Sequence, residues 1–215
     1  MNSISAILLK QHPLSGCVQD GNGNVKPFPI LAIDDVPLNI WINENTNIID
    51  RTDNLVPAQG WLYDFEKDLS LSNAWELLKP EASEYGAVST VVPVLICPDD
   101  LDLVCSVVMI EQVVTETEVK WIRFGRAWGN IHDLVTSVIW EKPFSSPVLT
   151  FKFSDFQKAY NDLKNLDTIW NELKEVYTAS FKNLVYGDLP NDEAILETLK
   201  RIKERLKTVE WTVRV

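Results

Sequence analysis

The longest hydrophobic runs of the chain lie between Val88 and Arg126, where two short polar segments interrupt them. The first segment, Pro98-Asp99-Asp100, and the second, Thr115 to Glu118, are rich in residues typical of turns. We therefore expect two hairpins that join three antiparallel strands, at Val88–Cys97, Leu103–Val114 and Val119–Arg126. Pro93 has no N–H to donate, so we expect the first of these strands either to lie at an edge of the sheet or to contain a bulge.

Strand-like patterns also precede this stretch. Ser3–Lys10 is predicted as an edge strand, and Phe28–Ile33 as a second strand that ends at Asp34-Asp35. The residues that follow alternate in polarity, with Leu38, Ile40 and Ile42 on one side and Asn39, Trp41 and Asn43 on the other. This period of two predicts a third, half-buried strand.

Helical patterns are rare before residue 154 and frequent after it. One short helix is expected around Ala74 to Leu78, and two more strands at Leu134–Trp140 and Pro147–Phe153. Ser154 and Gln157 have the spacing of a capping box, which predicts the start of a helix there. Its inward face would carry Phe156, Tyr160 and Leu163; further helices are expected from Asp167 and Asn191, and a last strand near Trp211 to Val213.

The order of these elements predicts the fold class. Strands come first and helices last, without alternation of strand and helix, which is typical of an α+β fold. We therefore expect a mainly antiparallel sheet followed by a C-terminal helical segment. No repeat or linker divides the 215 residues, so a single domain over 1–215 is predicted, with a soft boundary near residue 154.

Charge is distributed unevenly along the chain. The whole sequence has 20 Lys and Arg against 31 Asp and Glu, and residues 1–118 have 5 against 18. Such a field favours a basic partner and repels nucleic acid and anionic membranes, although the same charge would also serve solubility alone. No apolar segment is long enough for a transmembrane helix, and three irregularly spaced cysteines suit reduced thiols in the cytoplasm.

The residue types that carry catalysis or bind metals form no recognisable motif. The two histidines, His12 and His132, are far apart, and no CxxC pair is present to complete a zinc site. A Cys–His pair would have to draw on Cys17, Cys97 or Cys105, none of which has a basic neighbour that would activate a thiol. We therefore predict no catalytic residue, no metal and no cofactor. The alternative is a small hydrolase with a carboxylate- or cysteine-based site that one sequence does not reveal.

Basic and aromatic residues interleave between Lys120 and Trp128, a pattern that in a basic protein would suggest binding of single-stranded nucleic acid. In this acidic chain we expect instead that Lys120 and Arg126 pair with Glu111, Glu116 or Glu118 across a hairpin, with Trp121 in the core or at a partner surface.

The segments VVPVLICPDDLDLVCSVVMIEQ and VKWIRFG, together with the acidic character of the chain, resemble the immunity proteins that bacteria encode beside contact-dependent or polymorphic toxins. The resemblance implies a cytoplasmic protein that neutralises a cognate, basic toxin by forming a stoichiometric complex, and it transfers no binding residue. From the sequence itself we expect the partner to be bound by acidic clusters at strand ends and by nearby tryptophans. These are Asp34, Asp35, Asp99, Asp100, Asp102, Trp41 and Trp61.

Overall fold

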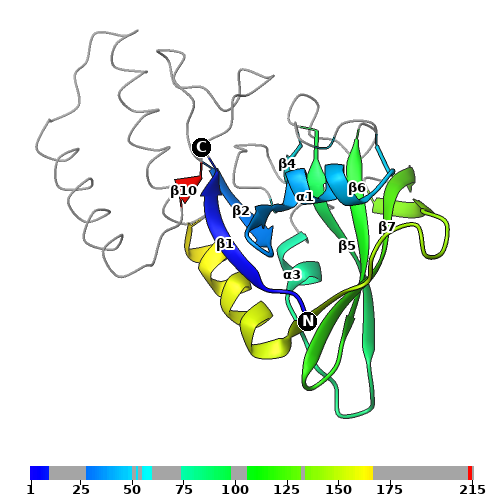
Figure 1. The fold of residues 1–215 in the computed structure, drawn as a ribbon. Coiled ribbons are helices and arrows are strands. Elements are labelled where there is room, and N and C mark those ends of the chain that lie inside the picture. The colour runs from blue at the N-terminus through cyan, green and yellow to red at the C-terminus, as the bar shows by residue number, and fades with distance from the viewer. Residues whose placement is uncertain are drawn as a thin grey trace, which may run out of the picture.

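The computed structural model describes residues 1–9, 28–49, 52, 55–59, 74–97, 106–131, 134–166 and 213–214. Two sheets form the framework, and antiparallel pairing predominates in both (Figure 1). The α+β class with a mainly antiparallel sheet is therefore confirmed. None of the helices in these ranges is long and apolar enough to cross a membrane.

The larger sheet has six strands in the order β4-β5-β6-β7-β8, and β9 also pairs with β7. Its strands are β4 Val56–Pro57, β5 Val88–Ile96, β6 Val107–Val114, β7 Glu118–Ile131, β8 Leu134–Trp140 and β9 Leu149–Lys152. The three predicted central strands, and the two predicted after them, are all present. β7 is longer than predicted, because it continues past Arg126 and pairs there with β8.

Local features of the central strands also follow the sequence. The register of β5 against β6 shifts between Pro93 and Leu95, so the bulge expected at the proline is confirmed. The turn between β6 and β7 is closed by a hydrogen bond of 2.8 Å from the Thr115 backbone N–H to the Glu118 carbonyl. The loop that carries Asp99 and Asp100 lies outside the described residues.

The smaller sheet has the order β10-β1-β2-β3 and pairs the first strand of the chain with its last described strand. Its strands are β1 Ile4–Leu9, β2 Phe28–Ile33, β3 Val36–Pro37 and β10 Val213–Arg214. β1 lies between β2 and the parallel β10, so the prediction of an edge strand at Ser3–Lys10 is wrong. The two-residue β10 pairs with Leu8 and Leu9, a long-range contact that no local pattern indicates.

Residues Leu38–Asn45 form helix α1, and the strand predicted here is wrong. The buried residues include Leu38, Trp41 and Ile42, at the i, i+3, i+4 spacing of a helix face. The alternating pattern had placed Trp41 on the outward face. Its ring packs inside against Phe124 of β7, with centroids 5.6 Å apart, and this contact requires the helical period.

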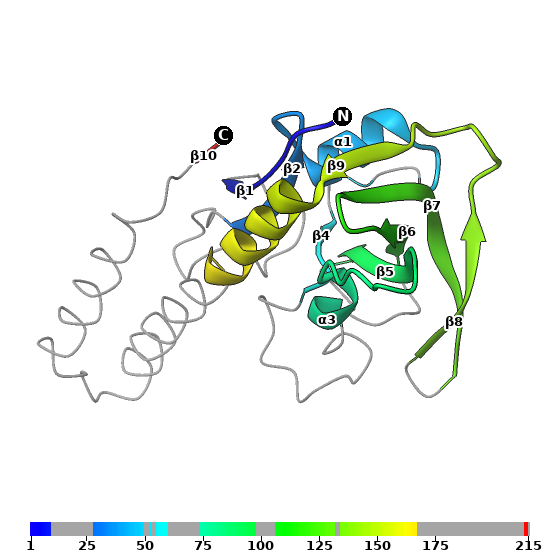
Figure 2. The same ribbon diagram turned by 90° about the horizontal axis from the view of Figure 1, so that it is seen from below.

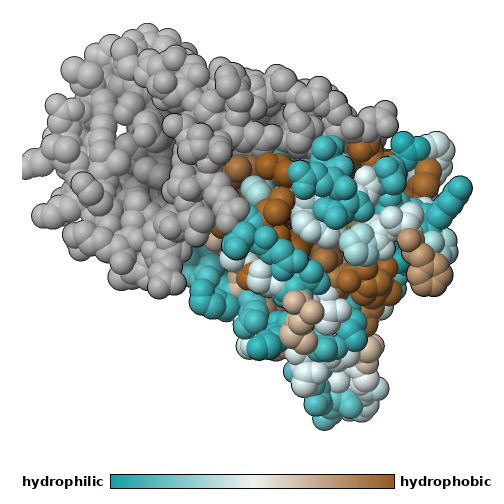
Figure 3. All heavy atoms as spheres, in the orientation of Figure 1, coloured by the Kyte–Doolittle hydropathy of each residue, from teal (hydrophilic) through white to brown (hydrophobic). Residues whose placement is uncertain are grey.

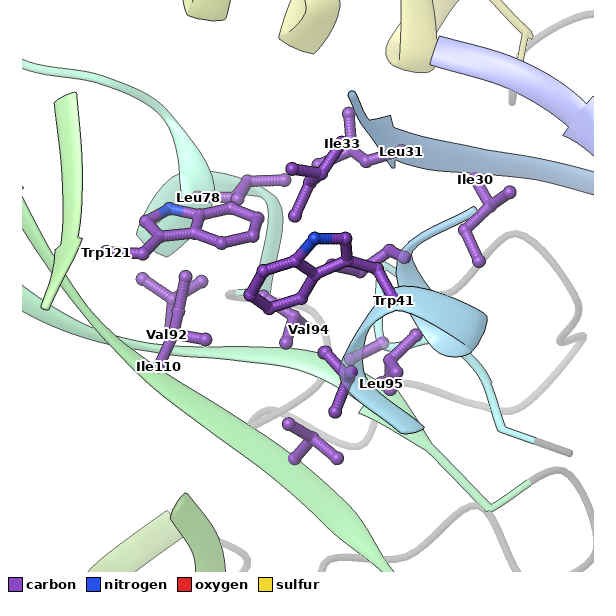
Figure 4. Packing of buried hydrophobic residues seen from close by; sticks show 14 of the residues in the cluster. Ile30, Leu31, Ile33, Trp41, Leu78, Val92, Val94, Leu95, Ile110 and Trp121 are labelled. Atoms are coloured by element: carbon purple, nitrogen blue, oxygen red, sulfur yellow. The ribbon is translucent and has the colours of Figure 1, made fainter. Parts of the chain in front are cut away.

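Within the described residues, one hydrophobic core joins the two sheets with the helices (Figure 4). The short helix α3, Ala74–Leu78, contributes Leu78, and residues 153–166 form a further helix whose inward face includes Phe156, Tyr160 and Leu163, as expected. The helix begins at residue 153, and the Ser154 hydroxyl donates to the Asp155 carboxylate (3.2 Å). The prediction that Ser154 is the N-cap of this helix is therefore wrong.

Candidate functional site

Asp34, predicted to contact a partner, has a structural role at the turn between β2 and β3. Its carboxylate accepts hydrogen bonds from the Asn2 side-chain amide (2.7 Å) and from the Ser3 backbone N–H (2.7 Å). Asn2 also donates its backbone N–H to the Thr150 carbonyl in β9 (2.7 Å), so the group ties the small sheet to the large one. These bonds, above all the one from Asn2, lower the pKa of Asp34 from its ordinary value.

We expect replacement of Asp34 by Asn to reduce stability in a pH-dependent way. A carboxylate whose pKa is lowered by folding stabilises the protein above its unfolded pKa near 3.8, and this contribution disappears as pH falls through the folded pKa. The loss at pH 7 should be about 1 kcal/mol or less, because the group is largely exposed, and it should shrink towards pH 3. Urea unfolding at both pH values measures it.

The matched control for that variant is Asp35→Asn at the next turn position. Asp34 and Asp35 have φ angles of 48° and 69°, a region that Asn tolerates well, so both variants keep the turn. An equal loss for Asp34→Asn at pH 7 and pH 3 would contradict the role of its charge.

The other predicted binding residues are not brought together in the described structure. Asp35 is exposed beside Asp34, whereas Trp41 is only 7% exposed and so cannot present its ring to a partner. This corrects the expectation that Trp41 is a surface anchor. Asp99, Asp100, Asp102 and Trp61 lie outside the described residues.

An acidic group with an exposed tyrosine lies at one end of the large sheet. Val88 pairs with Val114, so the chain entering β5 and the turn leaving β6 share this end, which is the lowest part of Figure 1. We call it the acidic end: Glu81, Glu84, Tyr85 and Glu116. Residues in this part of the surface are mainly hydrophilic (Figure 3).

The backbone of Tyr85 is held in a turn, and its side chain is exposed. Its side chain is 93% exposed, while its backbone N–H donates to the Ser83 hydroxyl (3.1 Å) and Gly86 closes the turn onto the Ser83 carbonyl (3.3 Å). Glu81 pairs with Lys79 (2.6 Å), a contact that raises the pKa of the lysine. Glu84 and Glu116 are exposed and form no ion pair with other described residues.

The opposite end of β7 has a different character. Residues 125–131 of β7 and strand β8 form a two-stranded extension, here called the arm, at the outer side of the molecule (Figure 2). On it, Trp128 is 68% and Ile139 41% exposed, and the Arg126 guanidinium lies 5.6 Å from the centre of the Trp128 ring.

The ion pairs expected across the hairpin are only partly right. Lys120 does pair with Glu118 (2.8 Å), but within β7 and not across the hairpin, and Arg126 has no carboxylate partner among the described residues. The ion pair across the hairpin is made instead by Arg123 with Glu111. Arg123 also stacks on Trp140, with its guanidinium carbon 4.6 Å from the ring centre. Trp121 belongs to the core and is not at the surface.

An open hollow of about 530 Å³ adjoins the arm, beside the segment that follows α1. It is lined by Asn47, Ile48, Arg126, Ile139, Trp140, Glu141, Lys142 and Ser145. One carboxylate oxygen of Glu141 accepts the Asn47 backbone N–H (2.6 Å), and the other is buried without a hydrogen-bond partner among the described residues. The hollow therefore presents two cations, Arg126 and Lys142, to a ligand.

The described residues do not assemble the catalytic groups considered above. Cys97 is a free, half-buried thiol in the part of the chain described, and the other two cysteines and both histidines lie outside it. Within the same ranges, no three His, Cys, Asp or Glu side chains are grouped so as to hold a metal ion. No family model matches the chain, and no curated protein or solved structure matches it significantly.

The exposed residues at the two ends of the sheet were only partly predictable. Arg126 and Trp128 belong to a basic and aromatic run that the sequence already distinguishes. Tyr85 was missed, although Ser83-Glu84-Tyr85-Gly86 has the composition of a turn and could have indicated an aromatic ring outside the strands.

Proposed function

We propose that this protein binds and neutralises a basic protein toxin by forming a stoichiometric complex, and that it does so in the bacterial cytoplasm. The observation that carries the proposal is the acidic end of the large sheet, which combines a 93% exposed tyrosine in a hydrogen-bonded turn with exposed carboxylates. Tyrosine is among the residues that contribute most to protein interfaces.

The electrostatics of the chain support a basic partner. Residues 1–118, which include the acidic end, have 18 acidic against 5 basic side chains. Exposed charges of one sign accelerate encounter with a partner of the opposite sign, and inhibition of a toxin depends on rapid capture. Glu84 and Glu116 are free of ion pairs in the described structure and can therefore meet basic side chains without first losing a partner.

The protein itself, used as bait in the source bacterium, provides the test. We expect it to retain a basic protein whose expression alone stops growth, and we expect co-expression of the chain to restore growth. The purified pair should contain one copy of each protein for every copy of the other. Retention of a partner that is neither toxic nor basic would contradict the proposal.

Charge reversal with a matched control shows whether the acidic end is responsible. Glu84→Lys with Glu116→Lys should lose protection of growth, whereas Glu44→Lys with Glu76→Lys changes the net charge equally at other exposed positions and should retain it. If both pairs behave alike, only the overall charge matters and the acidic end is not the docking site.

A further inference from the structure

We infer that the free edge of β8 binds an extended, acidic segment of another protein, which adds to the large sheet as a further strand. This surface lies at the end of β7 opposite to the acidic end, so the inference is independent of the proposed function. It rests on three features of the arm and the residues next to it: open backbone groups, exposed apolar side chains, and cations that have no carboxylate partner among the described residues.

The backbone of β8 has hydrogen-bonding groups to offer. Among the described strands it pairs with β7 alone, and it lies at the outer edge of the molecule in Figure 2. The Glu141 N–H donates to the Phe124 carbonyl (3.0 Å), which makes these two a hydrogen-bonded pair. Because such pairs alternate along an antiparallel ladder, the N–H and C=O groups of Trp140 and Val138 point away from β7.

The side chains next to this edge are of the kinds that anchor interfaces. Ile139 pairs with Arg126 in the β7–β8 register, and Arg126 lies against the exposed ring of Trp128. Trp140 carries Arg123 on its ring. Tryptophan and arginine are enriched at the energetic centres of protein interfaces, and a strand added to β8 would have side chains on both of these faces.

Charge complementarity identifies the segment as acidic. Arg126 and Lys142 both line the hollow beside β8, and neither forms an ion pair with a described carboxylate. Asp or Glu side chains of an added strand would supply that partner.

A second copy of this chain fits the same edge less well. Pairing of two β8 strands about a twofold axis would place the same surface on both sides of the interface. Arg126 and Lys142 of one copy would then approach the same cations of the other, and like charges placed opposite each other are unfavourable. An exposed edge strand with free backbone groups favours the addition of a strand from another protein, and the positive charges of Arg126 and Lys142 favour an acidic one.

The probe for this site is a labelled peptide in which valine and glutamate alternate. We expect it to bind the full chain and to slow hydrogen exchange at the backbone N–H groups of Val138 and Trp140. A peptide with lysine in place of glutamate should bind at least about tenfold more weakly. Absence of added protection at these two groups under saturating peptide would overturn the inference.

Two variants of the chain complete the test. Val138→Pro removes an outward N–H that β7 does not use, and Arg126→Glu reverses the charge without altering the edge; each should weaken binding of the acidic peptide about tenfold or more. Lys79→Glu, next to the acidic end, is the control and should bind normally. Unchanged affinity in Arg126→Glu, or a dimer of the free protein that the peptide dissociates, would overturn the inference.

Discussion

Replacement of Trp121 by Ala is expected to lower the free energy of unfolding by about 3–5 kcal/mol, the range for large aromatic residues in protein cores. The side chain is fully buried and its ring centre lies 5.4 Å from that of Phe151 and 5.9 Å from that of Phe156. Removal of the indole would leave a cavity between β7, β9 and the helix at residues 153–166. Urea unfolding, followed by circular dichroism, gives the difference directly.

Trp121→Phe separates the hydrogen bond of the indole from its volume. The indole N–H donates to the Gln112 side-chain oxygen (3.1 Å), and the Gln112 amide donates to the Leu78 carbonyl (3.2 Å). Phenylalanine would leave the buried glutamine oxygen without its donor, at a cost of about 1–3 kcal/mol. The control is Lys120→Ala, at a half-buried neighbour. If Trp121→Ala cost no more than Lys120→Ala, the central position of Trp121 in the core would be refuted.

Gly125→Ala is the second substitution for which we expect a large loss, about 1–3 kcal/mol, because it overpacks a closed site. A Cβ atom at Gly125 would lie 2.6 Å from the Ile139 carbonyl oxygen and 2.8 Å from both the Trp140 ring and a Val138 methyl group. The carbonyl belongs to the paired strand, so β8 would have to move away from β7.

The region in which hydrogen exchange accelerates distinguishes a local effect of Gly125→Ala from a general loss of stability. Hydrogen exchange should accelerate first at the groups that join β7 to β8, including the Glu141 N–H, while the β5–β6 ladder keeps its protection. The double variant Gly125→Ala with Trp140→Ala removes one of the three contacts, and the clash with the Ile139 carbonyl remains. Gly125→Ala with wild-type stability and exchange would show that β7 and β8 are not so closely paired.

The central hairpins were predictable because all the information for them is local. Apolar runs of strand length, turn residues between them and Pro93 at the bulge specify β5, β6 and β7 within one stretch of sequence. Helix α1 was not predictable in this way. Its residues fit both periods, and the choice depends on a contact with Phe124, far along the chain.

The candidate sites show the same division between local and long-range information. Asp34 looks like a free acid in a turn, and only the fold brings Asn2 to its carboxylate. The basic and aromatic residues around Arg126 indicated an unusual surface. Which of their side chains are exposed depends on the positions of β8 and of the hydrophobic core, which the sequence does not give. The exposure of Tyr85 follows from the position of its turn outside both sheets, which composition does not reveal.

The most direct test of the proposed function is the salt dependence of association between this protein and the partner it retains. The association rate constant should fall steeply with ionic strength for the wild type and much less for Glu84→Lys with Glu116→Lys, while Tyr85→Ala should mainly accelerate dissociation. Equal salt dependence in wild type and charge-reversed protein, together with unchanged dissociation of Tyr85→Ala, would contradict binding at the acidic end.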